Sequence, residues 1–263
     1  MDNMQNDDLV DPSQKAAIKR KRSDAVADRI RRHIFQAGLK PSDRLPQEPQ
    51  LIDMFGCSRS TIREALKSLE VQGLVQNSTG PAGGARVASV SPARTIGLLS
   101  NYFYFHPINI VQIYQIRRLT EPELAASVVG HLRDSHFAAL ERTIEEQHEH
   151  PTDAAGWAHH RKVEVEFHEI LIEACPNPLL GLMCRFVNEA INWTIGTVGD
   201  NELSWAFSCA NIDYHRRLID AFRSGDAERA REVMHEHVLS AESFLLRPNE
   251  PQQPVFAEPL QLD

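Results

Sequence analysis

Few features of this sequence fit a secreted, membrane-bound or disulfide-bonded protein. Its 263 residues include four cysteines, which are widely spaced and form no C-x-x-C pair, so a disulfide framework and a thiolate metal site are both excluded. No run approaches the roughly 18–20 apolar residues that a membrane span needs. No apolar segment behind a basic one suggests a secretory signal near residue 1. We therefore expect a protein of the reducing cytoplasm.

Signatures of catalysis are also scarce. The sequence contains no H-E-x-x-H pair, no nucleophile elbow and no P-loop. The glycine-rich segment 80–84 superficially suggests a phosphate loop, but no Lys-Ser or Lys-Thr pair follows it. Stretches that alternate with a period of two are too short for more than a hairpin. The pattern predicts a mainly α-helical protein.

Positive charge is concentrated near the start of the chain. The formal net charge is −8, yet residues 15–95 contain 15 Lys and Arg against 7 Asp and Glu. A basic first third joined to an acidic remainder favours a nucleic-acid-binding domain followed by a separate module. Residues 1–22 end in the run K-R-K-R. They are interpreted either as a flexible arm that adds phosphate affinity or as a solvated tail.

Residues 23–90 have the order of elements of a winged helix-turn-helix. A helix ends near Gly38, a short helix ends at Gly56, and a second helix of the turn runs over about 58–72. Two short β-like runs around a glycine-rich tip follow it. The N-terminal end of the second helix enters the major groove in such units, and an Arg side chain there can bind guanine through two hydrogen bonds. Lys67 would lie nearer the phosphate backbone.

The same residues resemble the GntR superfamily of bacterial repressors. The resemblance rests on G-L-x-P, R-L-P-x-E, F-G-C-S-R-S-T-I-R-E-A-L-K-x-L-E-x-x-G-L-V and G-G-A-R-V. It implies that the base and phosphate contacts fall on Arg59, Ser60, Thr61 and Arg63. It places the wing tip, near the minor groove, around Gly80, Gly83 and Gly84. Pro49 departs from the pattern, because the family usually has a basic residue there, so the operator preference is not carried over.

The remainder of the chain reads as helices separated by Pro and Gly stops. Helices are predicted over 94–105, 109–132, 134–149, 153–175, 178–199, 201–224 and 226–246. The sequence therefore predicts an all-helical second domain over 94–246. The last residues, 247–263, contain three prolines and are expected to form a disordered tail.

Three histidines of this half lie on the apolar faces of their predicted helices. His168 shares a face with Phe167 and Leu171, and His215 and His237 lie on the faces of two later helices. Glu164 is four residues before His168 and therefore on the same side of its helix. Three imidazoles and a carboxylate can surround a divalent ion inside a bundle. Ordinary core histidines are the alternative, and the spacing alone does not decide between them.

Residues 94–246 resemble the FCD ligand-binding domain of the FadR branch. The motifs are F-H-x-x-L with N-P-L-L, and Y-H-x-x-L-x-D-A-x-x-x-G-D followed by M-x-x-H. In metal-containing members an Asp and three His bind the ion, and the resemblance assigns those positions to Glu164, His168, His215 and His237. Asp has become Glu here, which alters the geometry of that ligand or leaves its place to water. Imidazole ligands favour Zn²⁺ or Ni²⁺, with Mn²⁺ a further candidate.

The expected mechanism is the sensing of a small carboxylate. The acid would bind the ion, with Arg117 as a second clamp and with Asn188 and Trp193 lining the cavity. Its binding would change the spacing of two DNA-binding heads in a homodimer on operator DNA. An effector-independent dimeric DNA-binding protein remains the second hypothesis. A metal-dependent hydrolase or lyase is the third, because three His and an open position also suit catalysis.

Overall fold

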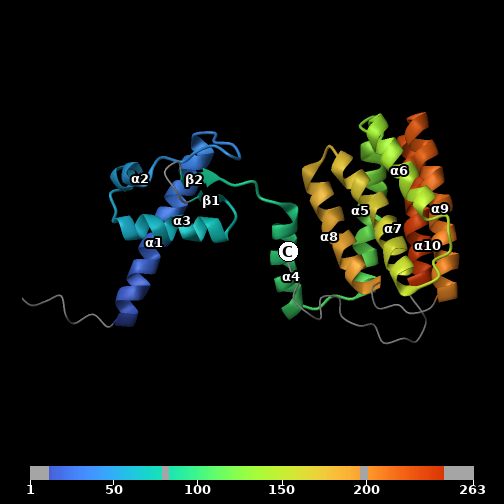
Figure 1. Cartoon of the computed structure of the whole chain (residues 1–263), viewed down its shortest axis with the longest axis horizontal. Helices are drawn as coiled ribbons and strands as arrows, with labels where there is room; N and C mark the ends of the chain where they lie inside the picture. Colours follow the sequence, from blue (N-terminus) through green and yellow to red (C-terminus); the bar gives the residue numbers. More distant parts are fainter. Residues whose placement is uncertain (1–11, 79–82, 196–200, 246–263) are drawn as a thin grey trace, which may run out of the picture. The chain divides into compact units, whose positions relative to one another are not determined.

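A computed structural model describes residues 12–78, 83–195 and 201–245 of the chain. It consists of two compact units, Met1–Thr95 and Ile96–Asp263 (Figure 1). The expected disordered tail over 247–263 lies outside the described residues. No helix in the described ranges is long and apolar enough to span a membrane.

The first unit contains three helices and a hairpin. These are α1 (Pro12–Gln36), α2 (Glu48–Phe55), α3 (Arg59–Val71), β1 (Val75–Ser78) and β2 (Gly84–Val87). The strands pair antiparallel, with Val75 opposite Val87 and Ser78 opposite Gly84. The order is that of a winged helix-turn-helix. One boundary differs from the sequence reading: α1 begins at Pro12, so half of the expected arm over 1–22 is helical.

Local chemistry explains the turn between α2 and α3. Gly56 ends α2 with a left-handed φ of 61°, and its N–H donates to the carbonyl of Ile52 at 2.8 Å. Ser58 then caps α3, because its Oγ accepts from the N–H of Thr61 at 3.2 Å. The buried face of α3 carries Ile62 and Leu69, and neither is exposed to solvent. The opposite face of α3, with its basic residues, therefore points outward.

The second unit is a helical bundle. Its helices are α4 (Pro92–Phe105), α5 (Ile110–Val128), α6 (Asp134–Glu146), α7 (Ala154–Ala174), α8 (Pro178–Ile195), α9 (Asn201–Ser224) and α10 (Ala227–Leu245). The mainly α fold class predicted from the sequence is confirmed. Pro and Gly mark most of the stops because they cannot continue a helix without cost.

Helix α5 lies at the centre of this bundle. It packs against α7, α8 and α10, and α9 packs against α10 (Figure 1). The large core around it is apolar, with Tyr114, Leu124 and Phe167 wholly buried. A group of ionisable side chains is buried beside this core, namely Arg117, Glu121, His168, His215 and His237. Because charged groups are costly to bury unless they are paired or hold a metal, this cluster is the candidate site.

Candidate functional site

Three histidines from three helices meet inside the bundle. His168 comes from α7, His215 from α9 and His237 from α10, and their exposed fractions are 3%, 0% and 0%. One ligand nitrogen from each ring lies within 4.8 Å of the others. Phe167 stacks on the ring of His215 at 3.7 Å between centroids, with the planes 1° apart, which holds that ring in place. The structure thus brings together the three histidines singled out in the sequence.

The spacing of these rings suits a small divalent ion. The Nε2 atoms of His168 and His237 are 3.3 Å apart. Two imidazole nitrogens that bind one tetrahedral ion at 2.0–2.1 Å are separated by about 3.3 Å. Neither ring nitrogen of His215 has a hydrogen-bond partner within the described ranges, and Nδ1 of His237 has none there either. Buried polar atoms normally have a hydrogen-bond partner, so ring nitrogens without one fit the role of metal ligands.

The electrostatics keep the rings in the form that binds metals. Burial lowers the pKa of all three imidazoles well below the ordinary value. The positive charge of Arg117 lowers the pKa of each ring further. The rings are therefore neutral at physiological pH, and a neutral imidazole has a lone pair for coordination.

A carboxylate and a guanidinium lie beside the histidines. Arg117 Nε donates to Glu121 Oε1 at 2.6 Å, and Arg117 Nη1 donates to the Tyr114 hydroxyl at 3.0 Å. Burial alone would lower the pKa of Arg117, but the pairing with Glu121 outweighs it and raises the pKa. The second oxygen of Glu121 is 3.4 Å from Nδ1 of His168. Neither of these two atoms has a hydrogen-bond partner among the described residues, so the contact places a carboxylate beside the ring without fixing its tautomer.

Glu164 is not grouped with the three imidazoles in this structure. Its carboxylate accepts a hydrogen bond from the Asn211 side chain, and it is not among the ligand atoms that cluster with the imidazoles. Burial raises the pKa of Glu164 to about 7, although Arg117 and Asn211 partly oppose the shift. A ligand role for Glu164 stays a prediction.

The raised pKa of Glu164 predicts a pH effect on stability in metal-free protein. The folded state keeps this proton up to about pH 7, whereas the unfolded state releases it near 4.5. The contribution of protonated Glu164 to stability is therefore fully present below the pKa of the unfolded state and is lost as the pH rises through 7. Glu164→Gln cannot ionise. The free energy of unfolding of this variant, relative to that of the unsubstituted protein, should therefore increase between about pH 5 and about pH 8, on the order of 2 kcal/mol. Urea unfolding after chelation measures this difference.

The matched control for this experiment is Glu173→Gln, which removes an exposed carboxyl from the same helix. Stability profiles of Glu164→Gln and the unsubstituted protein that run parallel across this pH range would contradict the assignment.

The two other expected cavity residues are less closely tied to the centre. Asn188 is 3% exposed on α8, and its Nδ2 donates to Glu169 of α7 at 2.9 Å. Glu169 also pairs with Arg185 of α8. The side chain of Trp193 lies outside the described residues. Both effector contacts stay predictions.

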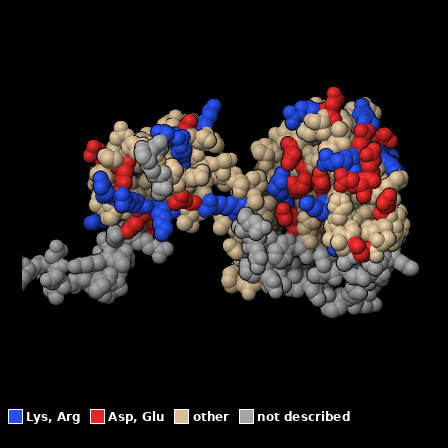
Figure 2. All heavy atoms as spheres, viewed as in Figure 1, with Lys and Arg blue, Asp and Glu red and all other residues tan. Residues whose placement is uncertain are grey.

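The residues predicted to contact DNA lie on α3, most of them in its first turns. The side chains of Arg59 and Arg63 are 64% and 67% exposed, and both are paired with Glu48 of α2. Ser60 and Lys67 are exposed on the same helix. Thr61 is buried, and its hydroxyl lies 2.8 Å from that of Ser58, so its hydroxyl supports the N-cap. Figure 2 shows many Lys and Arg side chains on the visible face of this unit.

The hairpin is described only in part. Gly80 lies outside the described residues, and Gly83 precedes β2. Gly84 has a φ of 130°, and a Cβ there would lie 3.3 Å from the side chain of Gln47. Only glycine combines that backbone with this close approach. The start of β2 therefore lies close to the side chain of Gln47.

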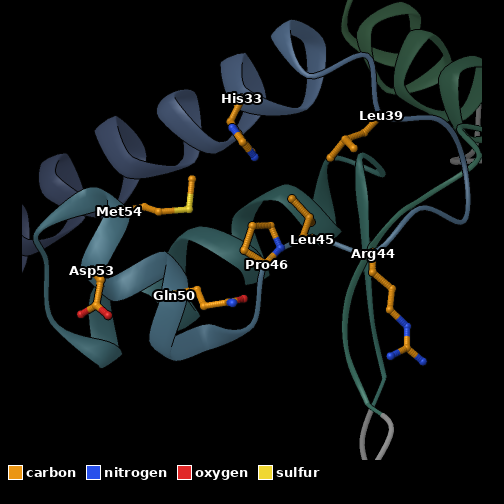
Figure 3. A pocket seen from close by; sticks show the side chains of 8 residues that line it. All are labelled: His33, Leu39, Arg44, Leu45, Pro46, Gln50, Asp53 and Met54. Atoms are coloured by element: carbon orange, nitrogen blue, oxygen red, sulfur yellow. The ribbon is translucent and has the colours of Figure 1, made fainter.

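An open pocket of 630 Å³ lies between α1 and α2 in the same unit (Figure 3). His33, Leu45 and Met54 are among the residues that line it. Pro49 is in the first turn of the neighbouring α2, where its missing N–H costs no helical hydrogen bond. The departure at Pro49 therefore leaves this helix intact.

Three polar residues near the buried histidines were assigned no role from the sequence. Tyr114 and Glu121 flank Arg117 at steps of three and four residues, and Asn211 is four residues before His215. Such steps place side chains on one face of a helix. A search for polar residues at these steps from each candidate would have found all three.

Comparisons with known proteins cover both units. Residues 22–84 match the family described as "Bacterial regulatory proteins, gntR family", and residues 112–240 match the FCD domain. The chain is 32% identical over 219 residues to the "HTH-type transcriptional repressor NanR" of Salmonella newport, covering 80% of this chain and 78% of that protein. The protein of the same name from Salmonella typhi matches to the same extent.

Among solved structures, the fold resembles "Streptococcus agalactiae GntR", with a TM-score of 0.58 at 23% identity. That match covers 84% of this chain and 99% of the other. At this identity the likeness supports the fold alone.

Proposed function

Because this chain belongs to the GntR family of DNA-binding transcription regulators and carries an FCD domain, we propose that it is a repressor whose FCD domain senses a small carboxylate through a bound divalent metal. The name of the Salmonella relatives supports repression as the direction of control. Operator DNA is the partner of the first unit, and a homodimer supplies two reading heads for two half-sites. Such a regulator acts in the cytoplasm.

The observation that carries the proposal is the meeting of three buried, neutral imidazoles. His168, His215 and His237 supply three nitrogen ligands and no negative charge. An ion held there keeps most of its double positive charge and leaves a position open for an anionic oxygen. Zn²⁺ or Ni²⁺ fits this donor set, and Mn²⁺ is the alternative. Glu164 is a candidate fourth ligand or a neighbour that hydrogen-bonds to the effector.

Arg117 is suited to hold the other end of an acid. Tyr114 and Glu121 fix its guanidinium, and its charge acts on all three imidazoles and on Glu164, so it lies close to the centre. Its partner Glu121 already balances one positive charge, which leaves the charge of the ion to attract the effector. A charge-assisted hydrogen bond from Arg117 would orient the carboxylate.

Effector binding can alter DNA binding only by favouring one arrangement of the protein over another. Ligands of the ion come from α7, α9 and α10, so an acid that bridges the ion and α5 changes the packing among four helices. In the proposed dimer this change is transmitted to the spacing of the two heads.

A thermal-shift screen of small organic acids tests the sensing role. In metal-loaded protein, an acid at about 100 times its Kd should raise the melting temperature by roughly 5–10 °C. The same acid should give no shift after chelation, because its anchoring ion is absent. The methyl ester of each active acid is the matched control, since it keeps the shape and removes the charge.

An equal shift in chelated and loaded protein would argue against coordination to the ion. No shift with any acid, together with operator binding that ignores metal, would favour the effector-independent dimer. Turnover of an acid by the loaded protein would favour a hydrolase or lyase instead.

A further inference from the structure

Glu48 contacts the two arginines that are the candidate base readers. Glu48 is the first residue of α2, and its side chain reaches the exposed face of α3. Oε1 accepts from Arg63 Nε at 2.7 Å, and Oε2 accepts from Arg63 Nη2 at 3.3 Å. Oε1 is also 3.8 Å from Nε of Arg59. One carboxylate thus engages one guanidinium with both oxygens and lies beside a second.

Stabilisation of the fold is a poor explanation for this arrangement. The side chains of Arg59 and Arg63 are about two-thirds exposed, and that of Glu48 is 27% exposed. Exposed ion pairs contribute little to stability, because water screens the charges and long side chains lose freedom. The arrangement nevertheless fixes the directions of two side chains on the surface that would meet DNA.

The bonds to Glu48 do not use the edge of the Arg63 guanidinium that could contact a base. A guanidinium has five N–H donors, and the bonds to Glu48 use the side formed by Nε and Nη2. The edge formed by Nη1 and the outer hydrogen of Nη2 then points away from Glu48. Guanine recognition in the major groove needs two such parallel donors, for O6 and N7. Holding the side chain in advance reduces the entropy lost when it binds.

The negative charge of Glu48 also affects binding to DNA that lacks the operator sequence. A carboxylate near the phosphate backbone repels it, whichever bases are present. Because this repulsion is the same at every sequence, it weakens binding to operator and non-operator DNA alike and does not by itself change the ratio of the two affinities. Discrimination comes from the positioning of the arginines, which strengthens binding only where the matching bases are present.

We propose that Glu48 is a specificity-determining residue, which positions Arg63 and Arg59 for base reading and weakens binding to non-operator DNA. The inference rests on the proposed role of these arginines at the operator. Glu48 acts through the arginines and is itself a positioning residue.

The test compares two affinities of the full-length protein. A consensus duplex is first selected from a random-sequence duplex library with the unsubstituted protein. The Kd of each variant is then measured for this duplex and for a scrambled duplex of the same composition. Glu48→Gln keeps the size of the side chain and removes its charge. It should reduce the ratio of the two affinities by about tenfold, with tighter binding to the scrambled duplex.

Two variants control for charge and for structure. Asp53→Asn removes one negative charge from the same helix. The carboxylate of Asp53 points away from His33 (Figure 3). This variant should leave the ratio of the two affinities unchanged. Glu48→Asp keeps the charge on a shorter side chain and should recover part of the discrimination. Melting temperatures identify any variant that is merely unfolded, and such a variant would lose affinity for both duplexes.

An unchanged ratio for Glu48→Gln would overturn the proposal. A loss of discrimination confined to one base pair, with cytosine on the contacted strand, would also overturn it, because Glu48 would then read that base directly. Failure of the unsubstituted protein to select any consensus would instead contradict sequence-specific DNA binding itself.

Discussion

Replacement of His168 and His215 together by alanine is expected to remove the proposed metal ion from the purified protein. Each substitution deletes one of three candidate nitrogen ligands, and a site with a single imidazole binds divalent ions weakly. The metal content per chain should fall by more than about tenfold, since loss of even an outer-shell partner weakens binding 10–100-fold. Elemental analysis after gel filtration measures it.

The control for this pair is His235→Ala. His235 is exposed on α10, two residues before the buried His237, and its loss should leave the metal content unchanged. Because alanine also leaves space in a buried cluster, circular dichroism must show that the double variant keeps its helices. Full retention of metal by a folded double variant would refute the histidine centre.

Loss of either arginine proposed to read bases is expected to give the largest change in affinity for operator DNA. Arg63→Ala or Arg59→Ala should weaken binding to the selected duplex by about 1–3 kcal/mol, the energy of one bidentate base contact, or roughly 5–150-fold. Binding to the scrambled duplex should change far less. Fluorescence anisotropy at a fixed salt concentration measures both affinities.

Lys67→Ala is the matched comparison for the arginines, because it removes a positive charge from the same helix nearer the expected phosphates. It should weaken binding to both duplexes alike and lower the slope of log affinity against log salt concentration by about one. Unchanged specific binding in both arginine variants would show that α3 does not read the operator.

Much of the fold could be predicted because its boundaries depend on local chemistry. Gly56 and Ser58 are separated by one residue, and this pattern alone indicates a helix stop followed by an N-cap. The start of α1 at Pro12 was harder to predict, because the charged run before Ser23 favours helix and solvated arm alike.

The histidine centre was predictable in its ligands and less so in its surroundings. Core-facing positions identify His168, His215 and His237, since helical periodicity determines the face on which each lies. The bond between Asn211 and Glu164 depends on the packing of α9 against α7, which no periodicity encodes. The pairing of Glu48 with Arg63 depends in the same way on the angle between two short helices.

The complete burial of the imidazoles has a consequence for timing. Because His215 and His237 have no exposed surface, an ion or an acid can enter or leave only when neighbouring helices separate for a moment. The frequency of that local opening then sets the speed of response, even for a ligand of high affinity. With the proposed ion in place, we expect such a regulator to retain it through many rounds of DNA binding and release, and to respond to sustained changes in acid concentration more than to brief ones.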